Sequence, residues 1–416
     1  MDPDMAADIV KFCKMADQKD EDSAFLIFDI DDVIKKVNYW KEKMPRINPF
    51  YAMKCNSDPM LLQTLAALNV GFDCASKMEI ETIINLGVPA DRIVYANTCK
   101  GFSHIRRAAE LKVELMTFDS EHELLKIKQL SPTAKLLLRL KIIGKSSKIS
   151  MNCKFGCDDT EVPRLLEATL QHNLSVIGVS FHVGSDIHDP DDFVTAIKTC
   201  RRVFDIAEKK GIRMYMLDIG GGFTGVISTR NCARKSNFDE ISEAVNQSID
   251  EHFQPYTAFK IIAEPGRYFA TTAFTLCSKI IGKRQRTVDN EEDTMYIINE
   301  GVYGHFVFTV FHHFKPAVKD MWPNLKDKKR SSIWGQSCDP ADLIVKKCML
   351  PELKVGDWIV FEEMGAYTSA CATNFNGFEK TGVKHVVSKK ALGDLENVLD
   401  SKFAAVYLKE SDKKIK

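Results

Sequence analysis

A lysine at the end of an apolar run is the first residue in this chain that could do chemistry. Lys54 falls at the end of the segment FYAMKC, where burial would strip water from its ammonium group. A desolvated lysine has a lowered pKa and becomes a nucleophilic amine that can form a Schiff base with a carbonyl compound. The same position also suits a lysine whose stem lies on apolar surface while its charge reaches water. Position alone leaves both interpretations open.

Two further segments could hold an anionic ligand. LDIGGGF places Gly220, Gly221 and Gly222 after a β-prone run, and successive backbone N–H groups can surround a phosphate. EPGRY follows another such run with Glu264 and Arg267. The glycines alone fit a tight turn equally well, and they match neither the dinucleotide fingerprint nor the nucleotide P-loop. A Schiff-base lysine, a phosphate site and a carboxylate for a protonated pyridine nitrogen together favour pyridoxal 5'-phosphate (PLP).

Adjacent histidines raise the question of a metal site. The segment VFTVFHHFKP is apolar and β-prone until it reaches His312 and His313. Neighbouring side chains in a strand point to opposite faces, so these two imidazoles would not easily bind one metal ion. Cys153 and Cys157 have a CxxxC spacing, but no second ligand pair lies near them in the sequence. We therefore predict no metal site, and we expect His313 to be structural.

Composition limits the partners of the chain. Its 57 basic and 57 acidic side chains cancel over 416 residues, which leaves no broad basic field for nucleic acid or an anionic membrane. No apolar stretch is long enough to span a bilayer, and the acidic N-terminus lacks the apolar segment of a secretory signal. Twelve cysteines without such a signal are typical of free thiols in a reducing compartment. The composition predicts a cytoplasmic protein.

The elements that must position these residues alternate regularly between β-prone runs and helical stretches. Amphipathic stretches of helical period separate eight β-prone runs: FYAMKC, VGFDCA, RIVYAN, ELMTFD, KLLLRL, SVIGVSFHV, MYMLDIG and KIIAEPG. This pattern favours a closed (β/α)₈ barrel over an open sheet. Barrel enzymes carry their chemistry at the carboxyl ends of the strands. We therefore expect one rim to hold Lys54, Asp73, Asn97, Asp119, Arg139, His182, Glu264 and Arg267.

The pattern changes after residue 268. Strand-like runs such as MYIINEGVYG, SSIWG and DWIVFEEMG are separated by turns and show little helical period. This part predicts a second, mostly β domain. The run AFLIFD precedes the first barrel unit and is expected to pair with that domain. The predicted division is therefore an N-terminal segment, 1–30, a cofactor-binding barrel, 31–268, and a C-terminal β domain, 269–416.

Long motifs now reveal a resemblance. They run in order from about residue 25 to residue 380: PFYAMKCN, GFDCASKMEIE, RIVYANTCK, MTFDSEHEL, VSFHVGS, LDIGGGF, IIAEPGRY, NEGVYG, SSIWGQSCD, EMGAYT and FNGF. The sequence resembles eukaryotic ornithine decarboxylase and its relatives, the group IV PLP-dependent amino acid decarboxylases. That resemblance implies an alanine-racemase-type barrel, a C-terminal β-barrel domain, PLP as cofactor, a small L-amino acid substrate, and a homodimer with active sites at the subunit interface.

The resemblance also assigns roles to single residues. Lys54 matches the Schiff-base lysine, Asp73 a carboxylate near it, His182 the imidazole stacked on the cofactor ring, and Glu264 the partner of the pyridine nitrogen. Arg139 and Lys154 match basic residues at the rim, Lys154 being associated with dimer contacts. The phosphate-binding set is matched by Ser185, Gly222, with its neighbours Gly220 and Gly221, Arg267 and Tyr367. Cys338, which guides protonation, and Asp339, which holds a distal amine, match residues contributed across the interface, and Phe375 matches an aromatic residue lining the site.

Two departures from the family pattern concern the substrate. Where the ornithine enzymes have a Tyr-Asp pair that binds the distal ammonium, this chain has Phe311 and His312, and it is two residues shorter before the next Lys-Pro. Asp186 replaces a family glycine after FHVGS. A histidine is a poor neighbour for a diamine because it is cationic at low pH. We predict weakened use of ornithine and a preference for a neutral or aliphatic amino acid such as leucine, unless Asp186 or another carboxylate serves instead.

A non-catalytic regulator remains the alternative. Antizyme inhibitors keep the family fold, lose activity and sequester antizyme. Residues 110–130, ELKVELMTFDSEHELLKIKQL, resemble the antizyme-binding element of the family, although a plain strand and surface helix would read the same. The retained set of Lys54, His182, Glu264 and Cys338 favours the enzyme, because a regulator has no physical need to keep them together.

Overall fold

The protein divides into two compact units. The computed structural model describes residues 3–19, 21–142, 144, 154–225, 237–253, 259–311, 316–319, 321, 327–395 and 406–409. Residues 35–269 form one unit, here called the barrel unit, and residues 1–34 with 270–416 form the other, here called the β unit. The boundaries fall inside two helices, α2 (Ile30–Lys43) and α10 (Arg267–Ala270), a few residues from the predicted positions 30 and 268.

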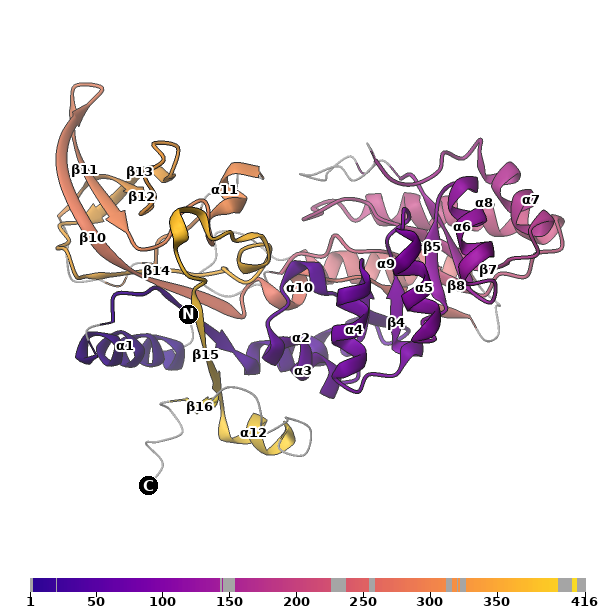
Figure 1. Ribbon diagram of the computed structural model, residues 1–416, viewed down its shortest axis with the longest axis horizontal. Helices are drawn as coiled ribbons and strands as arrows, with labels where there is room; N and C mark the ends of the chain where they lie inside the picture. Colours follow the sequence, from indigo (N-terminus) through magenta and orange to yellow (C-terminus); the bar gives the residue numbers. More distant parts are fainter. Residues whose placement is uncertain are drawn as a thin grey trace. The chain divides into compact units, whose positions relative to one another are not determined.

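The barrel unit contains the predicted closed barrel of eight parallel strands (Figure 1). Each strand pairs with its sequence neighbours, and β2 closes the ring on β9 through Ile47 opposite Ile261. The strands are β2 (Ile47–Ala52), β3 (Gly71–Cys74), β4 (Ile93–Tyr95), β5 (Leu115–Phe118), β6 (Lys135–Leu140), β7 (Ser175–Phe181), β8 (Met216–Asp218) and β9 (Lys260–Ala263). Seven of the eight expected β-prone runs contain one of these strands, and the eighth, FYAMKC, overlaps β2 at residues 50–52, which confirms the (β/α)₈ prediction.

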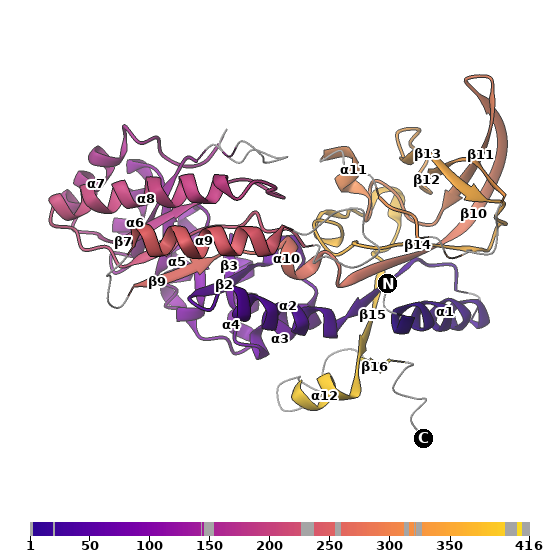
Figure 2. The ribbon, with the colours of Figure 1, turned by 180° about the vertical axis from the view of Figure 1, so that it is seen from behind.

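Amphipathic helices surround the strands, as Figure 2 shows from behind. They are α3 (Pro59–Ala67), α4 (Lys77–Asn85), α5 (Phe102–Glu110), α6 (Glu121–Leu130), α7 (Val162–Gln171), α8 (Asp191–Lys209) and α9 (Phe238–His252). Local sequence sets where they start. The Asp58 carboxylate caps α3 by accepting from the backbone N–H groups of Met60 and Leu61, each at 3.0 Å, and Pro59 occupies the first turn. Such starts fix the strand-to-helix turns that carry the rim residues.

The β unit is built around the N-terminal strand β1 (Phe25–Asp29). β1 runs antiparallel to β10 (Phe274–Val288) and parallel to β15 (Gly382–Val387), so the segment AFLIFD does pair with the β domain. The sheet order is β13-β12-β11-β10-β1-β15-β16, with β14 paired to β10. The other strands are β11 (Glu291–Ile298), β12 (Lys328–Trp334), β13 (Leu343–Pro351), β14 (Trp358–Phe361) and β16 (Val406–Leu408).

Among the described residues of this unit, one long helix and two short ones accompany the sheet. Helix α1 (Pro3–Gln18), which the sequence analysis did not predict, packs Ile9 and Phe12 into a core shared with Phe25 and Val360. The short helices are α11 (Val307–Phe311) and α12 (Lys389–Leu395). Of the 3₁₀ turns in the described part of the chain, Ser369–Cys371 and Phe375–Gly377 belong to the β unit, and Met53–Cys55 and Ala90–Arg92 belong to the barrel unit.

Two local predictions were wrong. The run VFTVF forms the short helix α11 rather than a strand, and Phe311 at its end is 72% exposed. Valine and phenylalanine favour strands, but within the described residues no strand pairs with this segment. A helical turn buries Val307 and Phe308 instead. The strand β2 also stops at Ala52, so Lys54 sits on a 3₁₀ turn and not on the strand itself. His312 and His313 lie outside the described residues.

Candidate active site

Lys54 forms an ion pair with Asp73 at the mouth of the barrel. Lys54 follows β2, and Asp73 lies on the neighbouring strand β3, where Ala52 and Asp73 are in register. The ammonium group donates to Oδ2 of Asp73. The Asp73 side chain is fully buried, whereas the Lys54 side chain is 42% exposed. Lys54 is therefore only partly desolvated, because the chain leaves the strand two residues before it, and its surroundings lie between the two interpretations that its sequence position left open.

His182 lies beyond the end of β7 as a neutral imidazole. Its Nδ1 accepts a hydrogen bond of 3.0 Å from the backbone N–H of Gly184, which leaves Nε2 to carry the proton. Desolvation lowers the His182 pKa to about 3, and the positive charges of Arg139 and Lys54 add to the effect. An uncharged ring whose orientation is fixed by this hydrogen bond can stack flat against a heteroaromatic cofactor.

The glycine run lets the backbone approach this imidazole. Gly220 has a φ of +62°, and a Cβ there would lie 2.1 Å from the carbonyl oxygen of Phe181. A Cβ on Gly221 would lie 2.9 Å from Nε2 of His182 and 2.8 Å from the carbonyl oxygen of Glu264. Any side chain at these two positions would therefore displace neighbouring groups. The glycines bring the ends of β7, β8 and β9 together.

Glu264 and Asp218 form a buried carboxyl pair at the ends of β9 and β8. Desolvation raises the pKa of Glu264 well above its usual range, and the negative charges of Asp218 and Asp73 raise it further. Desolvation also raises the pKa of Asp218 to about 7. Glu264 was predicted from the sequence. Asp218, in the segment LDIGGGF, was not predicted, because nothing in its own sequence context separates it from an ordinary strand-end aspartate.

Arg267 and Ser185 join two loops of the same rim. Nε of Arg267, at the start of α10, donates a 2.9 Å hydrogen bond to Oγ of Ser185 in the loop after β7. The next loop residue, Asp186, adopts a φ of +56°, a conformation in which a glycine is favoured and an aspartate is tolerated. Its carboxylate lies 3.8 Å from Nε2 of His188. The replacement of the family glycine therefore keeps the turn.

The remaining rim prediction is met in part. Arg139, on β6, is half-buried and stacks its guanidinium over the ring of Phe155, with the carbon atom 5.3 Å from the ring centre. Lys154 is exposed and lies 5.0 Å from the same ring centre. Asp119 accepts a 2.8 Å hydrogen bond from the backbone N–H of Gly156, so it serves the loop after β6. Asn97 caps its own turn by accepting from the N–H of Cys99.

A second cluster of predicted residues lies within the β unit. The hydroxyl of Tyr303 donates to Oδ2 of Asp339, and the backbone N–H of Ala341 donates to Oδ1 at 2.8 Å. The ring of Phe375 stacks on that of Tyr303 with centroids 4.2 Å apart. Hydrogen bonding from Tyr303 lowers the pKa of Asp339, which keeps this carboxyl ionised. Tyr303 was not predicted, although its motif GVYG had been noted.

Buried Asp342 holds the two loops of this cluster together. One of its oxygens accepts from the N–H of Val302 at 2.7 Å, and the other accepts from the N–H of Ser337 at 3.0 Å. Cys338, the next residue, is exposed, and its N–H donates to Oδ1 of Asn376 at 2.9 Å. Tyr367 is half-buried and has a φ of +57°. Sequence reasoning missed Asp342 because a buried loop carboxylate has no periodic signal.

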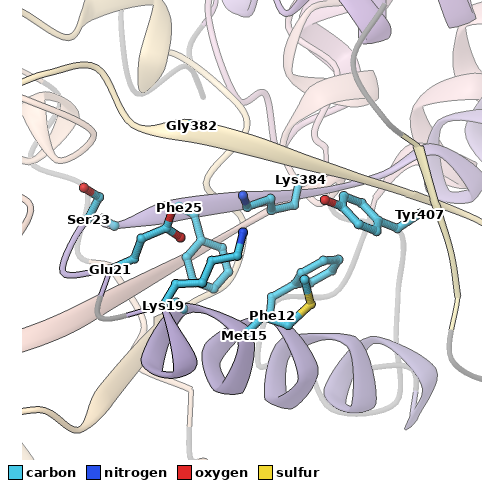
Figure 3. A pocket seen from close by; sticks show the side chains of 11 residues that line it. Phe12, Met15, Lys19, Glu21, Ser23, Phe25, Gly382, Lys384 and Tyr407 are labelled. Carbon is cyan, nitrogen blue, oxygen red and sulfur yellow. The ribbon is translucent and has the colours of Figure 1, made fainter.

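The β unit has a hollow of about 200 Å³ that no predicted site residue lines (Figure 3). Its apolar wall is made by Phe12, Phe25 and Tyr407, and the amines of Lys19 and Lys384 point into it. It shares no residue with the barrel rim or with the Tyr303 cluster. Within the described residues no group of three metal-ligating side chains occurs. No helix of this described part is long and apolar enough to cross a membrane.

The barrel rim fits PLP. Oε1 of Glu264 and Oδ1 of Asp73 are buried and lack a hydrogen-bond partner within the described residues, so the rim has acceptors to offer a protonated ring. Gly220 and Gly221 let the backbone after β8 lie directly against His182 and the end of β9, where a Cβ on either residue would collide with its neighbours. Lys54 supplies the amine that an aldehyde requires. When bound, PLP withdraws electrons from the bond that is broken at the substrate. The fold and this rim define a PLP-dependent enzyme of the barrel class.

Comparison with known proteins narrows that class to one family. Residues 30–271 match the family model for the pyridoxal-binding domain of pyridoxal-dependent decarboxylases. The chain is 44% identical to ornithine decarboxylase of Mus musculus over 382 residues, covering 89% of this chain and 82% of that protein. It is 41% identical to antizyme inhibitor 2 of Xenopus laevis over 389 residues, covering 90% and 83%. The chain therefore belongs to the eukaryotic ornithine decarboxylase family.

Solved structures agree with this placement. The arginine decarboxylase of Paramecium bursaria Chlorella virus superposes with a TM-score of 0.85 at 34% identity, covering 91% of this chain and all of that one. Lysine decarboxylase of Selenomonas ruminantium gives a TM-score of 0.81 at 35% identity, covering 89% and 93%. A structure of SrLDC in complex with PLP and cadaverine gives 0.80 at 33% identity, covering 93% and 97%. The protein is a PLP-dependent amino acid decarboxylase, which confirms the predicted cofactor and enzyme class.

Proposed function

We propose that this decarboxylase acts on an L-amino acid with a neutral or aliphatic side chain, such as leucine, in preference to ornithine. The observation that carries the proposal is the state of Asp339. Both of its oxygens already accept hydrogen bonds, from Tyr303 and from the N–H of Ala341. These bonds reduce the hydrogen-bonding capacity that the Asp339 carboxylate has left for the distal ammonium of a diamino acid. The stacked faces of Tyr303 and Phe375 beside it suit an apolar side chain.

His312 adds to the same preference. By the family resemblance it takes the place of the aspartate that binds the distal ammonium. Loss of one partner for a buried ammonium costs about 3–5 kcal/mol, or roughly two to four decades of affinity. Asp339 offsets part of that cost because it stays ionised. The predicted result is a low kcat/KM for ornithine and a higher value for a neutral substrate.

The proposed roles of the residues follow from their positions. Lys54, paired with Asp73, is the amine that holds the cofactor and releases product, and His182 supports the ring. Glu264 keeps the ring nitrogen protonated. Arg267 and Ser185, joined by their hydrogen bond, serve the phosphate together with the glycine run. In the homodimer that the resemblance implies, Cys338 and Asp339 of one subunit serve the site of the other, with Cys338 assisting return of a proton to the product.

The test is a screen of carbon dioxide release from ornithine, lysine, arginine and leucine. The wild-type protein and His312→Asp are compared, with His313→Asp as the matched control, since it adds the same charge one residue away. We expect His312→Asp to raise the ornithine-to-leucine ratio of kcat/KM by at least tenfold and His313→Asp to leave it unchanged. A wild-type preference for ornithine, or equal ratios in the two variants, would refute the proposed specificity.

A second candidate function rests on the antizyme inhibitor relative. Residues 110–130 comprise the end of α5, the strand β5 and the helix α6, on which Leu125 is 48% exposed. We propose that this surface can bind antizyme while the protein remains an enzyme. Leu125→Glu should weaken binding of purified antizyme at least tenfold without changing carbon dioxide release. A chain that binds antizyme as a monomer and fails to bind PLP would instead be a regulator.

A further inference from the structure

Glu300 is a buried carboxylate of the β unit that the proposed roles above do not use. It follows β11, and only 5% of its surface is exposed. Its Oε1 accepts from the backbone N–H groups of Gly301 at 2.9 Å and His305 at 3.2 Å. Its Oε2 accepts from the hydroxyl of Thr381 at 2.6 Å and lies 2.8 Å from Nδ1 of His305. Burial would raise the pKa of this carboxyl, but the hydrogen bonds outweigh burial and hold the pKa below its usual range.

The imidazole of His305 is held by this carboxylate. His305 is only 2% exposed. An ionised carboxylate can only accept, so Nδ1 of His305 carries the proton in the contact with Glu300. Nε2 is buried and lacks a hydrogen-bond partner within the described residues. A buried polar pair of this kind often contributes less stability than packed apolar side chains would, so its effect lies in the geometry that it fixes.

The segment between Glu300 and His305 is a tight loop folded over the carboxylate. A Cβ at Gly304 would lie 1.8 Å from Oε1 of Glu300, so only a glycine lets the backbone pass this close. The same loop is held by the buried carboxylate of Asp342, which accepts from one of its backbone N–H groups. Two buried carboxylates therefore fix the loop that carries Tyr303.

Tyr303 joins this loop to the residues proposed to meet the substrate. Its carbonyl oxygen accepts from the backbone N–H of Thr373 at 2.8 Å and from the Thr373 hydroxyl at 3.0 Å. Its ring stacks on Phe375, and its hydroxyl donates to Asp339. A change in the loop would therefore move the phenol hydroxyl relative to the Asp339 carboxylate.

We propose that Glu300 and His305 are positioning residues: their buried hydrogen bond fixes the loop that places the Tyr303 hydroxyl against Asp339, and it thereby sets how much of that carboxylate is left for a substrate. Thr381 supports the same carboxylate from the segment before β15. The effect on substrate choice rests on the proposed function of Asp339, whereas the effect on Tyr303 does not.

Matched variants test the position of Tyr303 directly. His305→Asn keeps an N–H donor in the place of Nδ1, and His305→Leu removes it. Thr381→Ser and Thr381→Val make the same comparison at the other side-chain donor. The full chain with PLP is labelled with ¹³C at the tyrosine Cζ atoms and titrated by NMR from pH 8 to pH 11, and Tyr303→Phe assigns the signal of Tyr303.

The expected result follows from the hydrogen bond to Asp339, which raises the pKa of Tyr303 above its usual value of 10. We expect His305→Leu and Thr381→Val to return the midpoint towards pH 10, and His305→Asn and Thr381→Ser to keep the wild-type midpoint. Asp293→Asn, which alters a buried aspartate of the β unit paired with Arg286, controls for general destabilisation and should leave the midpoint unchanged.

Two outcomes would overturn the inference. One is a wild-type midpoint in folded His305→Leu, and the other is an equal shift in His305→Asn, since that variant keeps the donor. Circular dichroism shows whether each variant is folded. If His305→Leu is unfolded, Thr381→Val decides by the same criterion, because it removes one donor and keeps the imidazole.

Substrate choice is then measured by carbon dioxide release from ornithine and leucine. His305→Leu should raise the ornithine-to-leucine ratio of kcat/KM severalfold, and it should have no further effect on this ratio in the Tyr303→Phe background. A merely structural role would lower both activities together in either background, which would contradict the positioning role. An unchanged ratio beside a shifted Tyr303 midpoint would instead refute the proposed function of Asp339 and support the positioning of Tyr303.

Discussion

Removing the charge of Lys54 should destabilise the apoprotein through its buried partner. Asp73 is fully buried and forms its ion pair with Lys54, so Lys54→Met leaves a carboxylate without that cation beside Glu264 and Asp218. Breaking a buried pair in this way costs about 3–5 kcal/mol. Because the Lys54 side chain is 42% exposed, solvent screens part of the pair, and we expect about 1–3 kcal/mol here.

A double-mutant cycle tests that origin. Asp73→Asn removes the stranded charge, so Lys54→Met with Asp73→Asn should recover most of the lost stability. We expect an interaction energy of about 1–2 kcal/mol from urea unfolding of the four apoproteins, followed by circular dichroism. Apoprotein is required because a bound cofactor would add its own stabilisation. Strictly additive losses in the double variant would show that the pair is not coupled and that the reasoning fails.

Three further predictions concern other parts of the chain. Lys100, buried and 2.9 Å from Glu123, should be structural, so Lys100→Met is expected to lower the unfolding free energy by about 3 kcal/mol in a urea titration. Tyr303→Phe frees an oxygen of Asp339 and should raise kcat/KM for ornithine relative to leucine severalfold, whereas a purely structural Tyr303 would lower both. Folding raises the pKa of Asp218 from 3.8 to about 7, so the folded state binds its proton more tightly than the unfolded state does. This proton therefore stabilises the fold fully below pH 4, and the contribution, at most about 4 kcal/mol, is lost as the pH rises to 7. Apoprotein stability should therefore fall over this range by less in Asp218→Asn than in wild type.

The sequence was informative where a pattern repeats or a motif is long. Alternation of β-prone and amphipathic runs predicted the barrel, because each strand and helix buries one regular stripe of side chains. The rim residues Lys54, Asp73, His182 and Glu264 followed from the rule that barrels carry function at strand ends, and the structure brings them together. Their individual roles rest on the family resemblance and remain proposals.

Other features could not be read from the chain because they depend on tertiary contacts. Asp218 differs from an ordinary strand-end aspartate only through the carboxyl of Glu264 opposite it. Tyr303 contributes to the site through its hydroxyl, which donates a hydrogen bond to Asp339, 36 residues away in the sequence. The helix formed by VFTVF had a strong local β preference, and burial of two side chains from one helical turn outweighed it.

The most direct test of the central claim is carbon dioxide release by the purified dimer or monomer, as isolated, with added PLP. Carboxyl-labelled L-amino acids are supplied as a mixture, and wild type is compared with Lys54→Ala. The account predicts release of labelled carbon dioxide by wild type, together with visible absorption from bound cofactor, and loss of both in Lys54→Ala. Wild-type protein that binds PLP but releases no carbon dioxide from any of the amino acids, or Lys54→Ala that releases it at the wild-type rate, would contradict the account.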